Sequence, residues 1–276
     1  MNPDTIQQAA EAILNSDGLL VCAGAGMGAD SGLPTFRGDN GFWNAYPALR
    51  HLGIRFVEMA DPRWFTDAPE MAWAFYGHRH QLYAATEPHA GFRILQRWAD
   101  QMERSSFVFT SNVDGHFQKA GFPEERVHEC HGSILHLQCL GSCRGIWPAG
   151  DLDLHIDFQS FRAEGMPICP DCRGMARPNI LMFGDGEWES ERSNVQQERL
   201  SNWLNSLTGL RLAIVEVGAG TAVPSVRYFS EGVANNPEVI MIRINKEAPE
   251  GPEGTISFQT GGLEALEAID SKLAKP

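Results

Sequence analysis

The sequence predicts an α/β fold: a Rossmann-type parallel sheet with helices on both faces, interrupted by a helical insertion and a small cysteine-rich domain. Short, continuously apolar runs, which are typical of strands buried on both faces, alternate along the chain with amphipathic helical stretches. Four cysteines cluster in one stretch that breaks this alternation. With 276 residues, 43% of them hydrophobic, the chain is long enough for a large and a small domain.

The elements of the sheet domain follow in order from the N-terminus. Apolar residues at helical spacing from Ile6 to Leu14 predict an opening helix, and residues 19–23 form the first buried strand. Runs of the same kind predict further strands at residues 107–110, 180–183, 212–217 and 239–244. Helical stretches accompany them at residues 91–103, 195–207, 223–234 and 262–273.

Two stretches do not fit the alternation of strands and helices. Residues 41–83 are rich in aromatic side chains and are typical of helices and loops, whereas residues 139–172 are loop-like, with many Gly and Pro. The prediction is therefore a Rossmann domain built from residues 1–40, 85–137 and 177–276. A helical insertion occupies residues 41–84, and the small domain occupies residues 138–176.

The charge balance limits which classes of partner the chain is expected to bind. Lys and Arg number 22 against 35 Asp and Glu, a formal net charge of -13, which argues against a dedicated nucleic-acid binder. An acidic surface favours cationic partners such as Lys-rich protein segments. We expect no membrane partner, because no apolar run is long enough to span a bilayer and the first residues lack the pattern of a signal peptide. The expected location is cytoplasmic.

Two close cysteine pairs predict a structural zinc site. Cys139 and Cys143 are separated by three residues, and Cys169 and Cys172 by two. Four thiolates in two short-spaced pairs are the usual ligands of a closed tetrahedral zinc, which would hold the small zinc-binding domain together and do no chemistry. The alternative is four free thiols. Residues 128 and 131 are histidines, but without a carboxylate in register they are weak evidence for a second metal.

A glycine-rich loop follows the first predicted strand. Gly24, Gly26 and Gly28 would let backbone N–H groups approach a pyrophosphate, as in dinucleotide-binding loops. Their spacing is not the usual G-x-G-x-x-G, and a tight structural turn explains the glycines equally well. The continuation to Phe36 and Arg37 favours the nucleotide, because it places an aromatic ring and a guanidinium just past the loop.

Further segments extend the pattern. Residues 24–37 (GAGMGADSGLPTFR) match GAG-(I/M)-S-x-x-SGI-P-D-FR, and residues 110–121 (TSNVDGHFQKAG) match T-Q-N-I-D-x-L-H-x-x-A-G. HGS at 131–133, RPNILMFGD at 177–185 and NKE at 245–247 match three later motifs in the same order. Spread over residues 20–247, these motifs resemble those of the sirtuins, the NAD-dependent protein-lysine deacylases.

The resemblance implies that NAD is consumed during catalysis. Sirtuins cleave the bond between nicotinamide and ribose and transfer the acyl group of an acylated lysine on a protein substrate to ADP-ribose. The likeness implies that His131 is the general base on a ribose hydroxyl, a task suited to an imidazole whose ordinary pKa is about 6.5. Asn112 is expected to hold the ribose hydroxyls and an ordered water. Asp114 is expected to accept a hydrogen bond from the nicotinamide carboxamide.

The same resemblance implies the rest of the cofactor and peptide sites. Phe36 is expected to cover the reacting ribose face and exclude water, and Arg37 to lie near the phosphates. The other expected cofactor-binding residues are Gly24, Ala25, Gly26, Ser31, Thr35, Ser111, Gly218 and Asn245, the last against the adenosine ribose. Phe183 and Gly184, followed by Asp185, are expected to form a wall of the cleft where the substrate backbone adds as a strand.

A pair of residues in the helical insertion points to acyl specificity. Tyr76 and Arg79 stand three apart and so share one face of the predicted helix. Sirtuins that remove succinyl or malonyl groups carry a Tyr-x-x-Arg pair on the equivalent helix, and Thr35, where many sirtuins have Asp, resembles some bacterial members of that class. A charge-assisted hydrogen bond to Arg is worth roughly 1.5–3 kcal/mol. The alternative is a solvated helix face, and deacetylation can coexist with the acidic preference.

Several departures from the family pattern leave alternatives open. Ser111 replaces the family Gln in the nicotinamide pocket, Asp185 replaces Glu, and residues 217–224 match the usual G-T-S-L-x-V-x-P only loosely. The main alternative is an NAD glycohydrolase or ADP-ribosyltransferase that uses the same site. A non-catalytic NAD-binding module is less compatible with the presence of both His131 and Asn112. An NAD dehydrogenase would need another glycine spacing.

Overall fold

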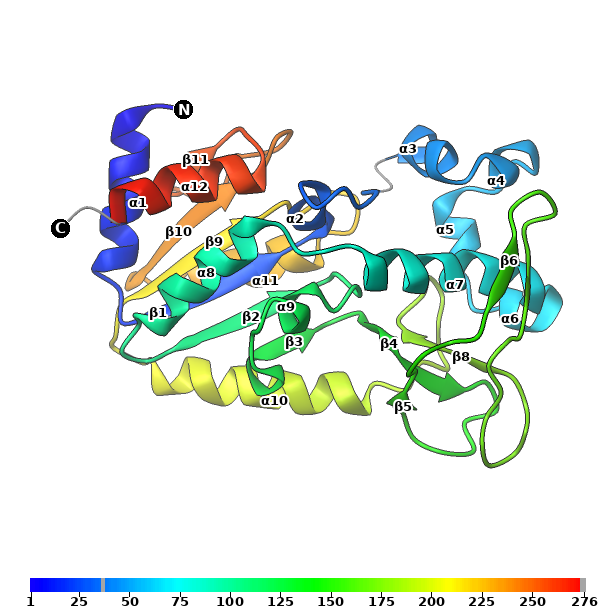
Figure 1. Cartoon of the computed structure of the whole chain (residues 1–276). Coiled ribbons are helices and arrows are strands. Elements are labelled where there is room, and N and C mark those ends of the chain that lie inside the picture. Colours follow the sequence, from blue (N-terminus) through cyan, green and yellow to red (C-terminus); the bar gives the residue numbers. More distant parts are fainter. Residues whose placement is uncertain (36–37, 274–276) are drawn as a thin grey trace.

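The computed structural model of the chain describes residues 1–35 and 38–273 and centres on a six-stranded parallel sheet (Figure 1). The strand order is β11-β10-β9-β1-β2-β3, and every adjacent pair runs parallel. The strands are β1 (Gly18–Ala23), β2 (Ser106–Thr110), β3 (Val127–Glu129), β9 (Leu212–Val217), β10 (Val239–Ile244) and β11 (Ile256–Phe258). The predicted fold class is confirmed.

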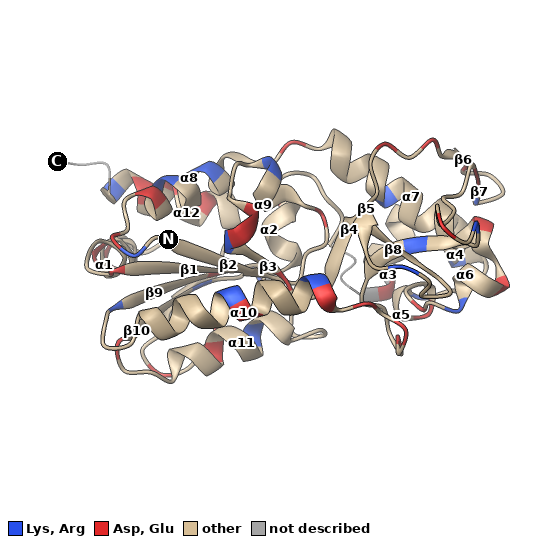
Figure 2. Cartoon of the chain, turned by 90° about the horizontal axis from the view of Figure 1, so that it is seen from below, with Lys and Arg blue, Asp and Glu red and all other residues tan. Residues whose placement is uncertain are grey.

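Helices cover both faces of this sheet, as Figure 2 shows with the strands seen edge-on. One face carries α1 (Pro3–Leu14), α8 (Ala90–Asp100) and α12 (Gly262–Leu273), and the other carries α10 (Glu191–Ser206) and α11 (Ser225–Ala234). Along β1, Leu19 and Val21 pack into the core under α8 and α12, whereas Leu20 and Cys22 pack into the core under α10 and α11. This two-sided burial is the reason why the strand sequence is apolar throughout.

A second lobe lies beside the sheet domain and combines both predicted insertions. Its helices are α3 (Gly38–Ala45), α4 (Pro47–His51), α5 (Phe56–Met59), α6 (Trp64–Asp67) and α7 (Pro69–Ala85). Its strands are β4 (Gly132–Cys139), β5 (Trp147–Pro148), β6 (His155–Asp157), β7 (Arg162–Glu164) and β8 (Ala176–Ile180). Side chains from both insertions, such as Phe42 and Trp73 from the first and Leu154 and Ala163 from the second, share one hydrophobic core. The boundaries predicted from the sequence stay predictions, and β4 crosses the one at residue 137.

Three short elements complete the chain near the sheet. They are α2 (Ala25–Ala29), α9 (His116–Lys119) and the 3-10 helix η1 (Glu124–Arg126). Within the described residues, no helix combines the length and the apolar character that crossing a membrane requires.

One predicted strand is wrong. Residues 180–183 are not a strand of the parallel sheet, because β8 ends at Ile180 and pairs antiparallel with β4. The following residues form a turn: the backbone N–H of Phe183 donates to the carbonyl of Ala60 at 2.9 Å, and that of Met182 donates to Asp185 at 3.3 Å. The apolar run is therefore explained by packing in the second lobe and not by a place in the central sheet.

A buried ion pair on β9 and β10 was not expected from the apolar pattern. Glu216 and Arg243 are register partners, and both side chains are 0% exposed. The Arg243 Nε lies 2.6 Å from a Glu216 carboxylate oxygen, and Ser230 of α11 donates its hydroxyl to the same carboxylate. Because Ser230 belongs to α11, its hydrogen bond to Glu216 links α11 to the sheet. Removing either member of the ion pair would leave the other charge buried and uncompensated.

The loops that follow β1 and β9 meet backbone to backbone. Gly218 has a φ of +66°, and a Cβ on it would lie 2.4 Å from backbone atoms of Gly26. The N–H of Gly26 donates to the carbonyl of Gly218 at 3.0 Å. A Cβ on Gly24 would in turn lie 2.7 Å from the Cα of Ala219. Only glycine permits this approach, because any side chain would force the two loops apart.

We predict that Gly218→Ala lowers the free energy of unfolding by about 2 kcal/mol or more, through positive-φ strain and the clash with the loop after β1. Gly220→Ala is the matched control, because a Cβ there meets nothing within 4 Å. Urea denaturation of the two variants measures the difference. Equal stability of the two variants would contradict the close-approach argument.

Candidate active site

A cavity of about 870 Å³ lies where the carboxyl ends of β1, β2 and β9 face the second lobe. It brings together residues that are far apart in the sequence. The predicted site residues that line it are Ala25, Gly26, Thr35, Tyr76, Arg79, Ser111, Asn112, Asp114, His131, Phe183, Gly218 and Asn245. In open α/β sheets, ligands bind at this edge of the sheet, so the position fits a nucleotide site.

Some predicted residues do not line the cavity. Gly24 is not among the lining residues and lies in close contact with Ala219. The hydroxyl of Ser31 accepts a hydrogen bond from the backbone N–H of His89 at 2.9 Å and so ties the glycine loop to the start of α8. Gly184 lies next to the cavity-lining Phe183, at a φ of +69°. Phe36 and Arg37 fall outside the described residues.

The glycine loops also orient the two asparagines of the cavity. The side-chain amide of Asn112 donates to the carbonyl of Gly24 at 3.0 Å, and that of Asn245 donates to the carbonyl of Ala219 at 2.7 Å. The Asn245 side-chain oxygen accepts from the N–H groups of Glu247 and Ala248. Since each amide nitrogen is directed at a loop carbonyl, the orientation of each side chain is set before any ligand binds.

Asp114 is a half-buried carboxylate that lines this cavity. Its Oδ1 accepts a hydrogen bond from the backbone N–H of His116 at 2.9 Å. Burial raises the pKa of the Asp114 carboxyl, while the nearby His116 and Arg79 oppose that rise. The carboxyl group therefore stands in a poorly solvated position, where an amide donor on a ligand would be a strong partner.

His131 lies in the turn between β3 and β4 and lines the cavity. Its Nε2 lies 3.1 Å from the hydroxyl of Ser225, the first residue of α11. Burial lowers the pKa of the His131 imidazole below its usual range, so the ring is neutral at pH 7. Gly132 makes this turn possible, because it has a φ of +76° and a Cβ there would lie 2.0 Å from the carbonyl oxygen of Asn179.

Arg79 enters the cavity from α7 inside an aromatic box formed by Phe75, Tyr76 and Tyr83. Its guanidinium carbon lies 5.3 Å, 5.8 Å and 5.4 Å from the centroids of these rings, respectively. The Nε of Arg79 donates to the hydroxyl of Tyr83 at 2.9 Å. Arg79 is 8% exposed and Tyr76 is 1% exposed, so the box is a desolvated cationic site that opens on the cavity.

The turn that carries Phe183 is fixed from beneath by a second buried ion pair. Arg177 donates through Nη1 and Nη2 to the two carboxylate oxygens of Asp185, at 2.8 Å and 3.0 Å. Both side chains are almost fully buried. Asp185 is thus held by Arg177 under the turn, and its carboxylate orients the residues at 182–184.

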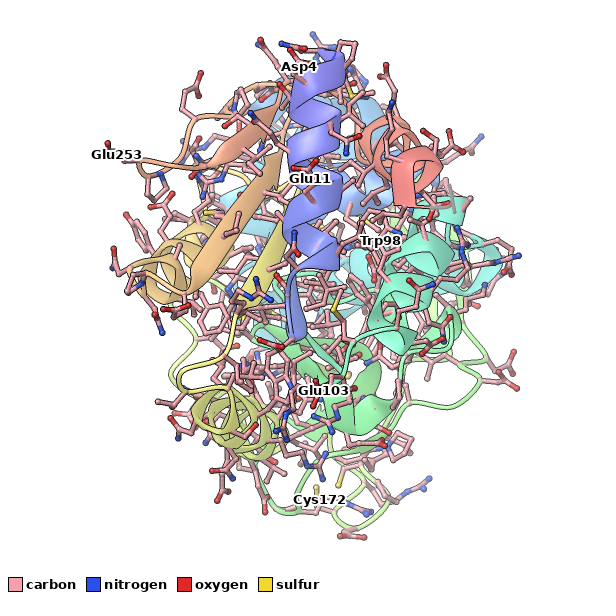
Figure 3. The ribbon with its side chains drawn as sticks, turned by 90° about the vertical axis from the view of Figure 1, so that its left-hand side faces the viewer. Asp4, Glu11, Trp98, Glu103, Cys172 and Glu253 are labelled. Atoms are coloured by element: carbon pink, nitrogen blue, oxygen red, sulfur yellow. The ribbon has the colours of Figure 1, made fainter. Side chains whose placement is uncertain are left out.

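The four predicted zinc ligands form one cluster away from the cavity. The sulfurs of Cys139, Cys143, Cys169 and Cys172 all lie within 4.8 Å of one another, and three of the separations are 3.4, 3.5 and 3.6 Å. Zn–S bonds of about 2.3 Å in a tetrahedron place sulfurs about 3.8 Å apart. The donor set therefore fits a closed structural zinc. Figure 3 places Cys172 at the lower margin of the molecule.

Comparison with known proteins identifies the family. The Sir2 family model matches residues 24–203. A relative from Mycobacterium tuberculosis named NAD-dependent protein deacylase is 32% identical over 257 residues, covering 92% of this chain and 96% of that protein. The chain belongs to the Sir2 family.

Other Sir2-family relatives and structures agree with this assignment. A protein of the same name from Aquifex aeolicus is 31% identical over 167 residues, covering 60% of this chain and 62% of that protein. A Sir2 homologue solved as an NAD complex has a TM-score of 0.68 at 22% identity and covers 97% of this chain and 93% of that one. At that identity, the structural likeness shows the Sir2 fold alone.

Two residues of the site in this Sir2-family chain were missed from the sequence. Ser225 follows a proline at the start of a predicted helix, and a hydroxyl there is ordinary for a helix start. Tyr83 lies one helical turn beyond Arg79 on α7 and therefore on the same helix face as Tyr76 and Arg79. The spacing alone could have identified Tyr83. The role of Ser225 depends on how α11 packs against the turn that carries His131, which the sequence does not show.

We predict that the purified protein carries close to one zinc per chain and that chelation unfolds the second lobe first. Cys143→Ser should lose the metal and lower the melting temperature, because a structural zinc contributes folding free energy directly. Cys22→Ser, which changes a buried thiol outside the cluster, is the control for metal content. Metal analysis and thermal denaturation check both. An unchanged zinc content in the Cys143 variant would contradict the site.

Proposed function

We propose that this chain is an NAD-dependent protein-lysine deacylase with a preference for succinyl and malonyl groups, and that it also removes acetyl groups. One observation carries the proposal: residues of the glycine loops, Asn112, His131 and the stripe of Tyr76, Arg79 and Tyr83 all line a single cavity. Its relatives are named NAD-dependent protein deacylases, which supports the general activity. The expected partners are acylated lysines of proteins, and the expected location is the cytoplasm.

The loops after β1 and β9 fit a dinucleotide. Gly26 and Gly218 line the cavity, and because they carry no side chains they are proposed to leave room for a pyrophosphate. Asn245, with its amide held by Ala219, is proposed to meet the adenosine ribose. Ala25, Thr35 and Ser111 are proposed to complete this binding surface, together with Gly24, Ser31, Phe36 and Arg37 as the family resemblance implies.

NAD supplies the chemistry through its glycosidic bond to nicotinamide, whose cleavage lets the ribose accept the acyl oxygen. The residues of this chain are proposed to orient NAD and to remove a proton from its ribose. Neutral His131 is proposed to take the proton of a ribose hydroxyl, with the imidazole held by Ser225. Asn112 is proposed to position the ribose hydroxyls, since its amide is fixed by Gly24. Asp114 is proposed to accept from the nicotinamide carboxamide.

The acyl-lysine is proposed to enter between the turn at Phe183 and the second lobe. Phe183 is 36% exposed and lines the cavity, and with Gly184 it would form one wall for the substrate backbone. A succinyl or malonyl carboxylate would then meet Arg79 and Tyr76, where a desolvated guanidinium makes strong charge-assisted hydrogen bonds. An acetyl group would gain nothing from that contact.

We predict that the acid limb of kcat/KM for an acetyl-lysine peptide has its midpoint below pH 6.5. The base must be neutral to act, and burial lowers the pKa of His131, so its protonated form appears only below the ordinary range. A pH–rate profile measures this. His131→Ala should abolish turnover while NAD still binds, and an acid limb above pH 6.5 would contradict the role of His131.

We predict that Arg79→Met lowers kcat/KM for succinyl- and malonyl-lysine peptides by about ten- to a hundredfold, with little effect on an acetyl peptide. The control is the acetyl peptide with the same variant and its NAD dependence. Mass spectrometry of the products separates the rivals: O-acyl-ADP-ribose supports deacylation. Free ADP-ribose without peptide turnover would instead indicate an NAD glycohydrolase, and equal loss on all acyl groups would remove the acidic preference.

A further inference from the structure

Tyr83 adds a third residue to the face of α7 that lines the cavity. Tyr76, Arg79 and Tyr83 stand at i, i+3 and i+7, so they form one stripe along the helix. All three line the cavity, and Tyr83 is only 6% exposed. Along this stripe, the guanidinium of Arg79 therefore has one phenol a helical turn before it and another a helical turn after it.

The contact between Tyr83 and Arg79 fixes the end of a long side chain. The hydroxyl of Tyr83 accepts from the Nε of Arg79 at 2.9 Å, and the guanidinium carbon lies 5.4 Å from the centre of the Tyr83 ring. An arginine in an open cavity would sample many rotamers, and ordering them on ligand binding costs free energy. Anchoring through Nε removes that cost and sets the plane of the fork.

The chemistry of a tyrosine suits this anchor better than that of a carboxylate. Burial raises the pKa of the Tyr83 hydroxyl, so the group stays neutral at physiological pH. A neutral oxygen orients the guanidinium without cancelling its charge, whereas an Asp or Glu at the same place would form an ion pair and weaken the attraction for an incoming anion. An apolar residue would leave the guanidinium plane unset.

We propose that Tyr83 is a positioning residue that acts through Arg79 to set the preference for acyl groups ending in a carboxylate. This inference rests on the proposed function and extends it to a residue that the Tyr-x-x-Arg pair does not include. The anchored Nε directs the Nη edge of the guanidinium to the ligand, so loss of the Tyr83 hydroxyl weakens binding of acidic acyl-lysines and leaves the chemical step unchanged.

Tyr83→Phe tests the proposal, because it removes one oxygen and keeps the ring. We expect KM for a succinyl-lysine peptide to rise about tenfold with kcat within twofold, and kcat/KM for an acetyl-lysine peptide to stay within twofold. Tyr228→Phe is the control for loss of a phenol hydroxyl outside the site. Tyr228 lies on α11, is 73% exposed and is not among the residues that line the cavity.

A double-mutant cycle with Arg79→Met separates this inference from the proposed function. If Tyr83 acts through Arg79, adding Tyr83→Phe to Arg79→Met causes no further loss on the succinyl peptide. An additive loss, or an equal loss on the acetyl peptide, overturns the role of Tyr83 while the acidic preference stands. If Arg79→Met alone shows no acyl-dependent effect, the acidic preference itself fails.

Discussion

The close approach of the loops that follow β1 and β9 is the constraint on which the site depends. With Gly26 and Gly218 in backbone contact, the two loops share one surface at the carboxyl edge of the sheet. The same loops hold the amides of Asn112 and Asn245 through their carbonyls. Backbone geometry thus positions the polar side chains of the cavity, so a change at these glycines would disturb orientation as well as stability.

The second lobe contributes the other half of the cavity through a helix that is stabilised by aromatic packing. Phe65 stacks on Tyr76 with ring centroids 5.6 Å apart, and Phe75 lies 5.1 Å from Tyr46. This aromatic packing surrounds the part of α7 in which the charge of Arg79 is buried. An apolar residue of similar size would avoid the cost of burying a charge, so the position of Arg79 is consistent with the proposed recognition of an anionic acyl group.

The sequence predicted the sheet and the metal cluster because both leave local patterns. Continuous apolar runs identified β1, β2, β9 and β10, and the cysteine spacing identified the four sulfurs that the fold brings together. The three-residue strands β3 and β11 are too short to show a period. The shared core of the two insertions, the Glu216–Arg243 pair and the contact of Ser225 with His131 depend on tertiary packing, which no local pattern records.

A crystal structure with a non-hydrolysable NAD analogue and a succinyl-lysine peptide would show where both substrates bind. We expect the pyrophosphate against Gly26 and Gly218, a ribose hydroxyl within hydrogen-bond distance of His131, and the succinyl carboxylate against the guanidinium of Arg79. A dinucleotide bound outside this cavity would contradict the proposed site. So would an imidazole of His131 that is directed away from the ribose.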